Sequence, residues 1–422
     1  MIMTMDSKFQ QNEKDRLRTL AEELATYAER KQNEEKKAAW RALNDLESYR
    51  PLLWINEIPW KEMDVNGELT CQCEHPLARQ IEQSFLRTLY QLRHMPDDTV
   101  VEPVCHVRPV VHNTGFGIRQ QGDNIVSQDS GVTAQHFERQ IFTLDDVQKI
   151  KDPQLSVDWS QSQRNLQLVQ ESIGDILRVE MGGVGHQWFA LWDTLIRWYG
   201  VEAALLDLVM NPELVHAAMQ RLLEAHLAML EQQIELNLLI LDNNNSRIGS
   251  GGLGYTSQLP QADFNGQVRP CDQWGCANAQ ILAAVSPAMH EEFALTYDRQ
   301  WLKRFGLTYY GCCEPLDNKI SILRAIPNLR KISISPWAKV ERVIEEVGTD
   351  YVISWKPSPA VLAQDNWHPE LVRQEIANFL DMTRGLHTEI ILKDISTTRV
   401  QPSRLWEWAE IASEEIQRRY PH

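Results

Sequence analysis

The sequence predicts an α/β protein built as a (β/α)8 TIM barrel with an N-terminal helical extension. From residue 51 onward, short β-rich segments alternate with helical patterns, which indicates a parallel sheet because a parallel partner strand needs a long crossover. Nine segments are strand candidates, close to the eight of a barrel. No Pro- or Ser-rich linker divides the chain, so we expect one catalytic barrel over residues 51–422 after an extension over residues 1–50.

The extension is expected to be helical over residues 7–48, where apolar residues recur at spacings of three and four. A charged run over residues 30–37 indicates a solvated face or a break between two helices. Pro51 ends the helix, because proline disfavours helical geometry in the preceding residue. The expected strands then cover residues 52–56, 100–111, 176–181, 238–242, 268–274, 307–312, 329–334, 351–355 and 388–393. The expected helices cover residues 78–92, 162–173, 192–236 (several helices), 287–305, 320–326, 340–346, 369–382 and 403–418.

Composition excludes several classes of protein. The chain of 422 residues has 58 acidic and 42 basic residues, a net charge of −16 that disfavours nucleic acid and anionic membrane surfaces as partners. No segment approaches the roughly 20 apolar residues of a membrane span. Seven cysteines is an odd number, which favours a reducing compartment over a disulfide framework. We therefore expect a cytoplasmic protein.

A Gly- and Asn-rich stretch over residues 243–267 has no periodic apolar pattern. Its GSGGLG run lacks the following helix that a phosphate-binding loop requires. The stretch follows an expected strand end, where barrel enzymes carry substrate loops, so it is expected to be a flexible substrate loop.

Polar residues at the expected strand ends are the candidate site, because a barrel forms its site at the carboxyl ends of its strands. The catalytic candidates are Glu180, Lys393 and Asp394. The substrate-binding candidates are His112, Asn243, Trp274, Trp355 and Lys356.

The adjacent thiols Cys312 and Cys313, followed by Glu314, are the sharpest chemical signal. Thiolates are strong zinc ligands, and a catalytic zinc needs three protein ligands with one open position. Cys276, Glu314 or Asp394 could complete such a site across the mouth of the barrel. The alternative is that both cysteines are buried small apolar residues.

The segment over residues 271–337 resembles the C-terminal half of the uroporphyrinogen decarboxylase superfamily. Ser286-Pro287, Phe293 and Tyr297 match a helix of that family, and Gly311-Cys312-Cys313 falls at its Cys-containing turn. The similarity extends over about residues 268–420 and is weak before residue 200.

The resemblance implies a barrel and one of two chemistries. An arginine-rich motif of the true decarboxylases is not found, which favours the branch of zinc-dependent methyltransferases that work with corrinoid proteins. In that branch a His-x-Cys pair and a later Cys hold the zinc. Here Cys313 matches the first Cys, Gly311 replaces the His, and Asp394 stands near the position of the later Cys.

The leading hypothesis is thus a zinc-dependent methyltransferase that moves a methyl group from a small O- or N-methyl substrate to a corrinoid protein. Zinc would act there as a Lewis acid. The second hypothesis is a metal-assisted decarboxylase or lyase for a small carboxylic acid, bound by Lys356, Lys393 or Arg399, with Glu180 or Asp394 handling the proton. A non-catalytic binding barrel is the third. A homodimer fits this type of barrel.

Overall fold

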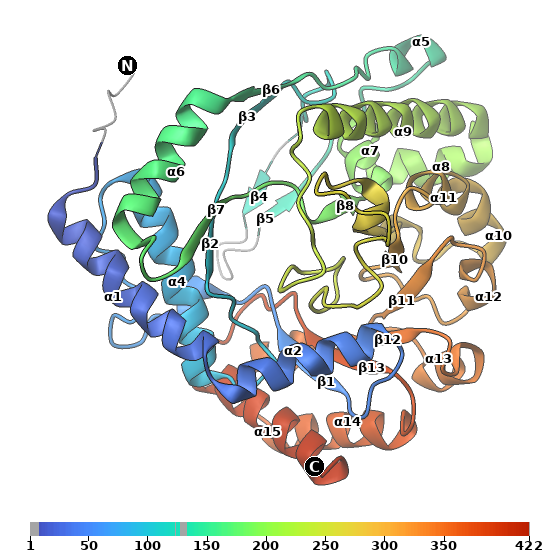
Figure 1. Cartoon of the computed structure of the whole chain (residues 1–422). Helices are drawn as coiled ribbons and strands as arrows, with labels where there is room; N and C mark the ends of the chain where they lie inside the picture. The colour runs from blue at the N-terminus through green and yellow to red at the C-terminus, as the bar shows by residue number, and fades with distance from the viewer. Residues whose placement is uncertain (1–7, 123, 127–132, 422) are drawn as a thin grey trace.

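The computed structural model describes residues 8–122, 124–126 and 133–421, and its centre is a seven-stranded parallel sheet (Figure 1). The strand order is β1-β13-β12-β11-β10-β9-β8, and every neighbouring pair is parallel. The strands are β1 (Leu52–Ile55), β8 (Gln187–Phe189), β9 (Trp274–Ala277), β10 (Leu307–Tyr310), β11 (Leu329–Ile334), β12 (Val352–Trp355) and β13 (Thr388–Leu392). The expectation of an α/β protein with a parallel sheet is confirmed.

Six further strands form three separate pairs. β2 (Val104–Val107) pairs with β7 (Arg178–Met181) in parallel, whereas β3 (Val110–Asn113) with β6 (Leu155–Asp158) and β4 (Asn124–Val126) with β5 (Thr133–Gln135) are antiparallel. Among the described residues no strand pairing links β1 to β2 or closes the sheet. A closed barrel is therefore not observed, although the arrangement is compatible with an open one.

The strand expected over residues 238–242 forms only an isolated bridge between Val184 and Leu239. Between this segment and the start of β9, side chains make hydrogen bonds that backbone groups would make in a regular sheet. The Gln273 amide donates to Val184 O (2.8 Å) and Ile240 O (2.6 Å). The buried Asp242 carboxylate accepts the backbone N–H of Trp274. Propensity alone could not predict this substitution of side chain for backbone.

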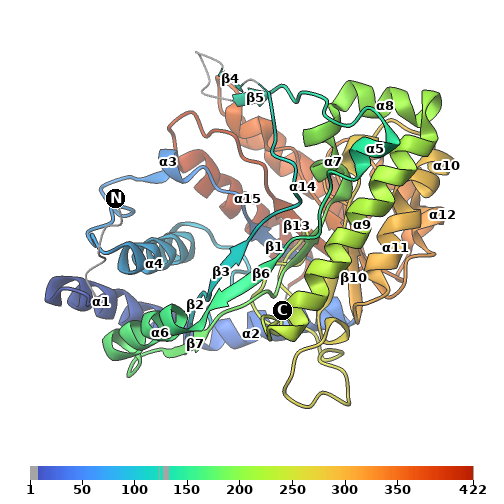
Figure 2. The same ribbon diagram turned by 90° about the horizontal axis from the view of Figure 1, so that it is seen from above.

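Helices surround the sheet, as Figures 1 and 2 show. Their bounds are α1 (Gln11–Ala28), α2 (Lys31–Asn44), α3 (Trp60–Met63), α4 (Pro76–His94), α5 (Leu144–Val147), α6 (Trp159–Ile173), α7 (Leu191–Tyr199), α8 (Val201–Met210), α9 (Pro212–Glu235), α10 (Pro287–His290), α11 (Thr296–Leu302), α12 (Ile320–Leu323), α13 (Val340–Val347), α14 (Pro369–Met382) and α15 (Ser403–Arg419). The expected helical extension is two helices with a break before Lys31, and the expected long helical region is α7 to α9. A π-helical turn (Glu291–Leu295) separates α10 from α11. In the described part of the chain, no helix is both long enough and apolar enough to cross a bilayer.

One face of the sheet, here called the inner face, carries alternate residues of each strand. Lys331 on β11 contacts Glu389 on β13 across the intervening β12, and Tyr309 on β10 contacts Ser354 on β12 across β11. These contacts require all four side chains to project from the same face. Because side chains alternate with period two, the first or second residue beyond a strand continues this face at its carboxyl end.

Part of the glycine-rich stretch, residues 248–256, fills the inner face and is not a flexible substrate loop, whereas most of residues 257–267 are exposed. Residues 248–256 are all buried. A Cβ atom on Gly252 would lie 2.2 Å from the Trp40 ring, and one on Gly251 would lie 2.5 Å from the Glu389 carboxylate. Glycine is therefore required for close packing between α2 and the sheet. This corrects the sequence-based interpretation, which took the absence of periodicity as a sign of mobility.

Candidate active site

The carboxyl ends of β10, β12 and β13 bring together five of the residues that the sequence analysis selected. Cys312 and Cys313 follow β10, Lys356 follows β12, and Lys393 with Asp394 follows β13. Parallel strands place these ends on the same edge of the sheet. Among them the cysteines and Lys393 are in direct contact, so this edge, here called the rim, is the candidate active site.

The two thiols differ in environment. Their Sγ atoms lie 3.5 Å apart, with Cys312 buried and Cys313 half-buried. A hydrogen bond from the Cys313 thiol lowers the pKa of Cys312, and the nearby Lys393 ammonium acts in the same direction against the effect of burial. The same hydrogen bond and burial raise the pKa of Cys313. Cys312 is thus the thiol that ionises first. The thiolate form of a cysteine, and not the thiol form, is the strong nucleophile.

The ammonium of Lys393 lies between the thiols and a carboxylate. Its Nζ is 3.8 Å from Cys312 Sγ, 3.6 Å from Cys313 Sγ and 2.5 Å from Asp394 Oδ2. Burial opposes its charge, yet attraction by the thiolates and by Asp394 raises its pKa overall. Lys393 therefore stays protonated and supplies a fixed positive charge beside both sulfur atoms.

Glu57, which follows β1, connects this cluster to the glycine-rich stretch over residues 243–267. Its carboxylate forms an ion pair with Arg247 (2.8 Å) and accepts the backbone N–H of Asp394 (3.1 Å). Burial raises the pKa of Asp394, but its contact with the Lys393 ammonium outweighs this effect and lowers the pKa overall. Asp394 is therefore a poor proton donor near neutral pH.

Lys356 is buried deeper than Lys393. Its Nζ donates to Tyr309 Oη (2.5 Å) and to the Ser354 carbonyl and hydroxyl oxygens (both 2.9 Å). Burial lowers the pKa of Lys356 to about 7 despite attraction by Glu389, and repulsion from Lys393 adds to the effect of burial. An amine with such a pKa can give or take a proton near neutral pH.

Glu314 and Cys276, expected as metal ligands, make other contacts. The Glu314 carboxylate is buried and accepts the backbone N–H groups of Ala279 (3.1 Å) and Cys312 (2.9 Å), so it fixes the turn that presents the thiols. Cys276 Sγ donates to Gln187 O (2.8 Å). These bonds to backbone groups hold the side chains of Glu314 and Cys276 in place.

The rim donors do not fit a zinc site. A zinc ion needs three or four ligands around one centre, and the centre beside Cys312, Cys313 and Asp394 is already taken by the Lys393 ammonium. Within the described ranges no group of three or more His, Cys, Asp or Glu side chains could hold a metal ion. The positive charge beside these sulfur atoms in the structure is that of Lys393.

Three other candidates lie away from the cluster. Glu180 on β7 forms an exposed ion pair with Arg178 (2.7 Å), and His112 on β3 is exposed, both outside the seven-stranded sheet. The Asn243 amide donates to Leu259 O (2.7 Å) and so ties together two parts of the glycine-rich stretch over residues 243–267. The sequence analysis placed them at a common mouth because it assumed that all predicted strands join one barrel.

The tryptophan candidates have structural roles. Trp274 begins β9 and is buried, with its indole N–H donated to Gly254 O (3.0 Å). Trp355 stacks on Phe379 of α14, with ring centroids 4.0 Å apart. The expected strand over residues 268–274 ends at Trp274, but Pro270 begins a 3-10 turn and the observed strand begins at Trp274.

Two rim residues were missed by the sequence analysis. Asn278 directly follows β9 and Ser335 directly follows β11, and both are 1% exposed. Within the described residues, both side-chain polar atoms of Asn278 and the Ser335 hydroxyl have no hydrogen-bond partner. Ser335 directly follows the expected strand over residues 329–334, so the strand-end rule could have selected it, whereas the expected strand over residues 268–274 ends four residues before Asn278.

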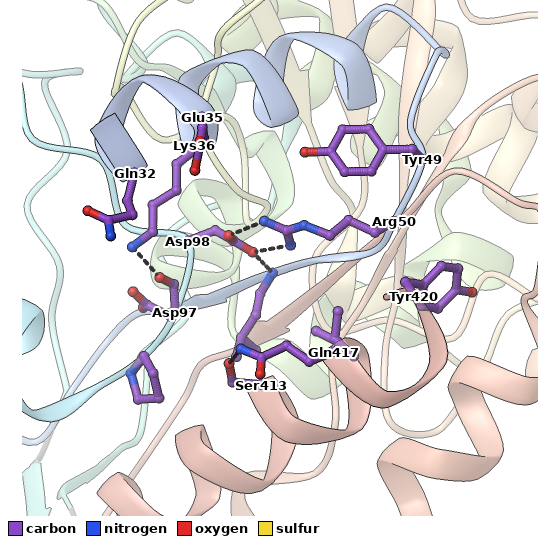
Figure 3. A pocket seen from close by; sticks show the side chains of 13 residues that line it. Gln32, Glu35, Lys36, Tyr49, Arg50, Asp97, Asp98, Ser413, Gln417 and Tyr420 are labelled. Atoms are coloured by element: carbon purple, nitrogen blue, oxygen red, sulfur yellow. Dashed lines mark hydrogen bonds and ion pairs between the residues drawn. The ribbon is translucent and has the colours of Figure 1, made fainter. Parts of the chain in front are cut away.

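A cavity of about 310 Å³ lies near the amino end of β1, between α2, the segment before β1 and α15 (Figure 3). Its polar groups are already engaged: Arg50 pairs with Asp98 (2.7 Å) and Lys36 donates to Asp97 O (2.7 Å). None of the rim residues lines this cavity. Its contacts tie the N-terminal helices to the sheet.

Comparison with solved structures finds a methyltransferase from Methanosarcina mazei, with a TM-score of 0.49 and 10% sequence identity, over 91% of this chain and 98% of that chain. No family model and no curated protein matches the chain. The functional assignment therefore depends on the residues of this chain.

Proposed function

We propose that the chain is a methyltransferase that takes a methyl group from a small O- or N-methyl substrate and uses Cys312 as its thiolate nucleophile. The observation that carries this proposal is the contact of Cys312 with the Cys313 thiol (3.5 Å) and the Lys393 ammonium (3.8 Å) at the carboxyl ends of the strands. The resemblance of residues 271–337 to the uroporphyrinogen decarboxylase superfamily, which includes corrinoid-linked methyltransferases, supports the same reaction class, and the proposed fold is an open (β/α)8 barrel.

The first step forms a carbon–sulfur bond and breaks the bond from the methyl carbon to oxygen or nitrogen. The electron pair of the broken bond goes to the leaving atom. A quaternary amine leaves as a neutral amine, whereas an ether oxygen leaves as an alkoxide that must take up a proton. Lys356, with a pKa of about 7, is the group at the rim that can supply it.

The proposed acceptor is a reduced corrinoid carried by a partner protein. Its electron pair would form the new bond to carbon, and the Cys312 sulfur would recover its thiolate pair. The Lys393 ammonium, 3.8 Å from that sulfur, lowers the energy of the returning negative charge. Lys393 would thus promote release of the methyl group as well as ionisation of Cys312. Zinc has no role in this scheme.

A second candidate function is a decarboxylase or lyase for a small carboxylic acid. The low pKa of Lys356 is the observation that favours it, since a buried amine that exchanges its proton near pH 7 suits a proton-transfer step. Glu180 is no longer part of this candidate, because it pairs with Arg178 outside the main sheet. Release of carbon dioxide without a corrinoid would identify this reaction.

The test compares Cys312→Ser with the matched variant Cys313→Ser. The full-length protein is incubated with cob(I)alamin and a panel of donors (2-methoxyethanol, methoxyacetate, tetramethylammonium), and methylcobalamin is followed by absorbance. We expect Cys312→Ser to reduce transfer by at least about 100-fold, because a serine hydroxyl is not ionised near neutral pH, and Cys313→Ser to reduce it much less. Unchanged transfer by Cys312→Ser would overturn the proposal.

A measurement without substrate checks the same assignment. Iodoacetamide alkylation of each cysteine is followed against pH by peptide mass spectrometry. Cys312 should begin to react at a lower pH than an ordinary thiol and Cys313 at a higher pH, since their pKa values shift in opposite directions. The reverse order would remove Cys312 as the nucleophile.

A further inference from the structure

The charged groups at the rim and on the inner face below it already have partners. Lys393 pairs with Asp394 (2.5 Å) and Arg247 with Glu57 (2.8 Å). Deeper on the inner face, Lys331 pairs with Glu389 (2.8 Å). The three hydrogens of the Lys356 ammonium point to Tyr309 and Ser354. A substrate carboxylate would therefore have to compete with these partners for each cation, and its desolvation would be poorly repaid.

The uncharged groups at the rim are in the opposite state. Within the described residues, Asn278 has neither its amide N–H nor its carbonyl oxygen bonded, and the Ser335 hydroxyl is also unbonded. Both residues are 1% exposed, so bulk water does not satisfy them. The Asn56 amide nitrogen and the Arg247 Nε are further buried donors without a partner. Leaving such a group unpaired destabilises the folded protein, so a bound molecule that pairs with it gains affinity.

The backbone places these groups on one edge. Residues at positions 274, 276 and 278 alternate toward the inner face, as do those at 331, 333 and 335, because Lys331 lies over the Trp274 ring and contacts Glu389. Between them, after β10, Gly311 donates its N–H to Ala277 O (2.8 Å). On the other side of Ser335, after β12, Lys356 donates its N–H to Ile334 O (2.9 Å). Asn278 and Ser335 thus flank the turn that presents Cys312.

We infer that Asn278 and Ser335 form a subsite for an uncharged oxygen-bearing group of the substrate, such as a hydroxyl, ether or carboxamide, and that the substrate is a neutral molecule. This inference rests on the proposed methyl transfer at Cys312 and names its substrate class. Asn278 can donate to an ether or carbonyl oxygen and accept from a hydroxyl, so a hydroxylated methyl ether satisfies both of its atoms. The subsite disfavours a carboxylic acid, the substrate of the second candidate function.

The test uses matched pairs of small O-methyl compounds that differ in charge, beginning with 2-methoxyethanol and methoxyacetate and extending to larger aliphatic and aromatic pairs. Binding to the full-length protein is measured by ligand-observed NMR titration. We expect the neutral member to bind at least about tenfold more tightly than the carboxylate. We expect Asn278→Ala and Ser335→Ala each to weaken neutral binding about three- to tenfold, the range of one hydrogen bond. Equal or tighter binding of the carboxylates, or no binding of any neutral member, overturns the inference.

Two controls separate this outcome from other failures. Asn33→Ala removes a buried amide whose hydrogen bonds to Ala28 and Val101 are all made, so it should lower stability and leave ligand binding unchanged. Asn278→Ala removes no hydrogen bond within the protein, so its melting temperature should be unchanged or higher. Cys312→Ser should abolish transfer but retain neutral binding. Loss of transfer with intact Asn278-dependent binding thus tests the nucleophile, and intact transfer with Asn278-independent binding contradicts the subsite alone.

Discussion

The inner face of the sheet carries two polar layers that differ in how their groups are satisfied. Toward the amino ends of the strands, Lys331 and Glu389 are fully buried, pair at 2.8 Å and lie beneath Trp40 and Gly252. At the carboxyl ends, Asn278 and Ser335 are equally buried but have no partner within the described residues. Buried polar groups that pair with one another stabilise the fold, whereas buried polar groups without partners can bind a ligand.

The largest effect is expected from breaking the satisfied layer. Lys331→Met leaves the Glu389 carboxylate buried without a counter-charge, which should lower the free energy of unfolding by about 3–5 kcal/mol. Denaturant unfolding of the variant measures this loss. The double variant Lys331→Met/Glu389→Leu should recover most of it, because no buried charge remains. A single variant as stable as the wild type would show that the layer is not structural.

A smaller loss of stability is expected where residues 248–256 pack over Lys331 and Glu389. Gly252→Ala adds a methyl group that would lie 2.2 Å from the Trp40 ring, so the packing must shift at a cost of about 1–3 kcal/mol. Gly182→Ala is the matched control, since the nearest atom to its Cβ would be at 3.4 Å. Thermal and denaturant unfolding of both variants give the comparison. Equal stability of the two would mean that residues 248–256 are loosely packed.

The sequence predicts the regular strands of this architecture better than the hydrogen bonds made by side chains. Hydrophobic alternation and length locate β1, β10, β11, β12 and β13 to within one or two residues. The same pattern fails at residues 238–242, where Gln273 and Asp242 replace a strand partner through side-chain hydrogen bonds. Such contacts join residues about 30 positions apart, and no local pattern carries them.

The candidate site shows the same division. The thiols, Lys356, Lys393 and Asp394 could be selected because each is a reactive type of residue at a strand end. The partners that give them their chemistry could not, since the contact of Lys393 with both sulfurs depends on the pairing order of β10 and β13 across the sheet. Glycine misled the interpretation of residues 243–267, because close packing and flexibility favour the same residue.

The smallest effect concerns the proton of Lys356, which lies between the two layers. Its pKa is about 7 in the folded protein and 10.5 for an ordinary lysine. Below pH 7 both states hold the proton, so this residue adds no pH dependence. Between pH 7 and about 10 the unfolded state binds more protons, so the free energy of unfolding should rise by about 1 kcal/mol per pH unit relative to Lys356→Met. Unfolding curves at pH 6, 7, 8 and 9 measure the difference, with the exposed Lys303→Met as a control that should show no such slope. A flat difference across this range would mean that Lys356 keeps its proton when buried, and it could not then exchange that proton near neutral pH.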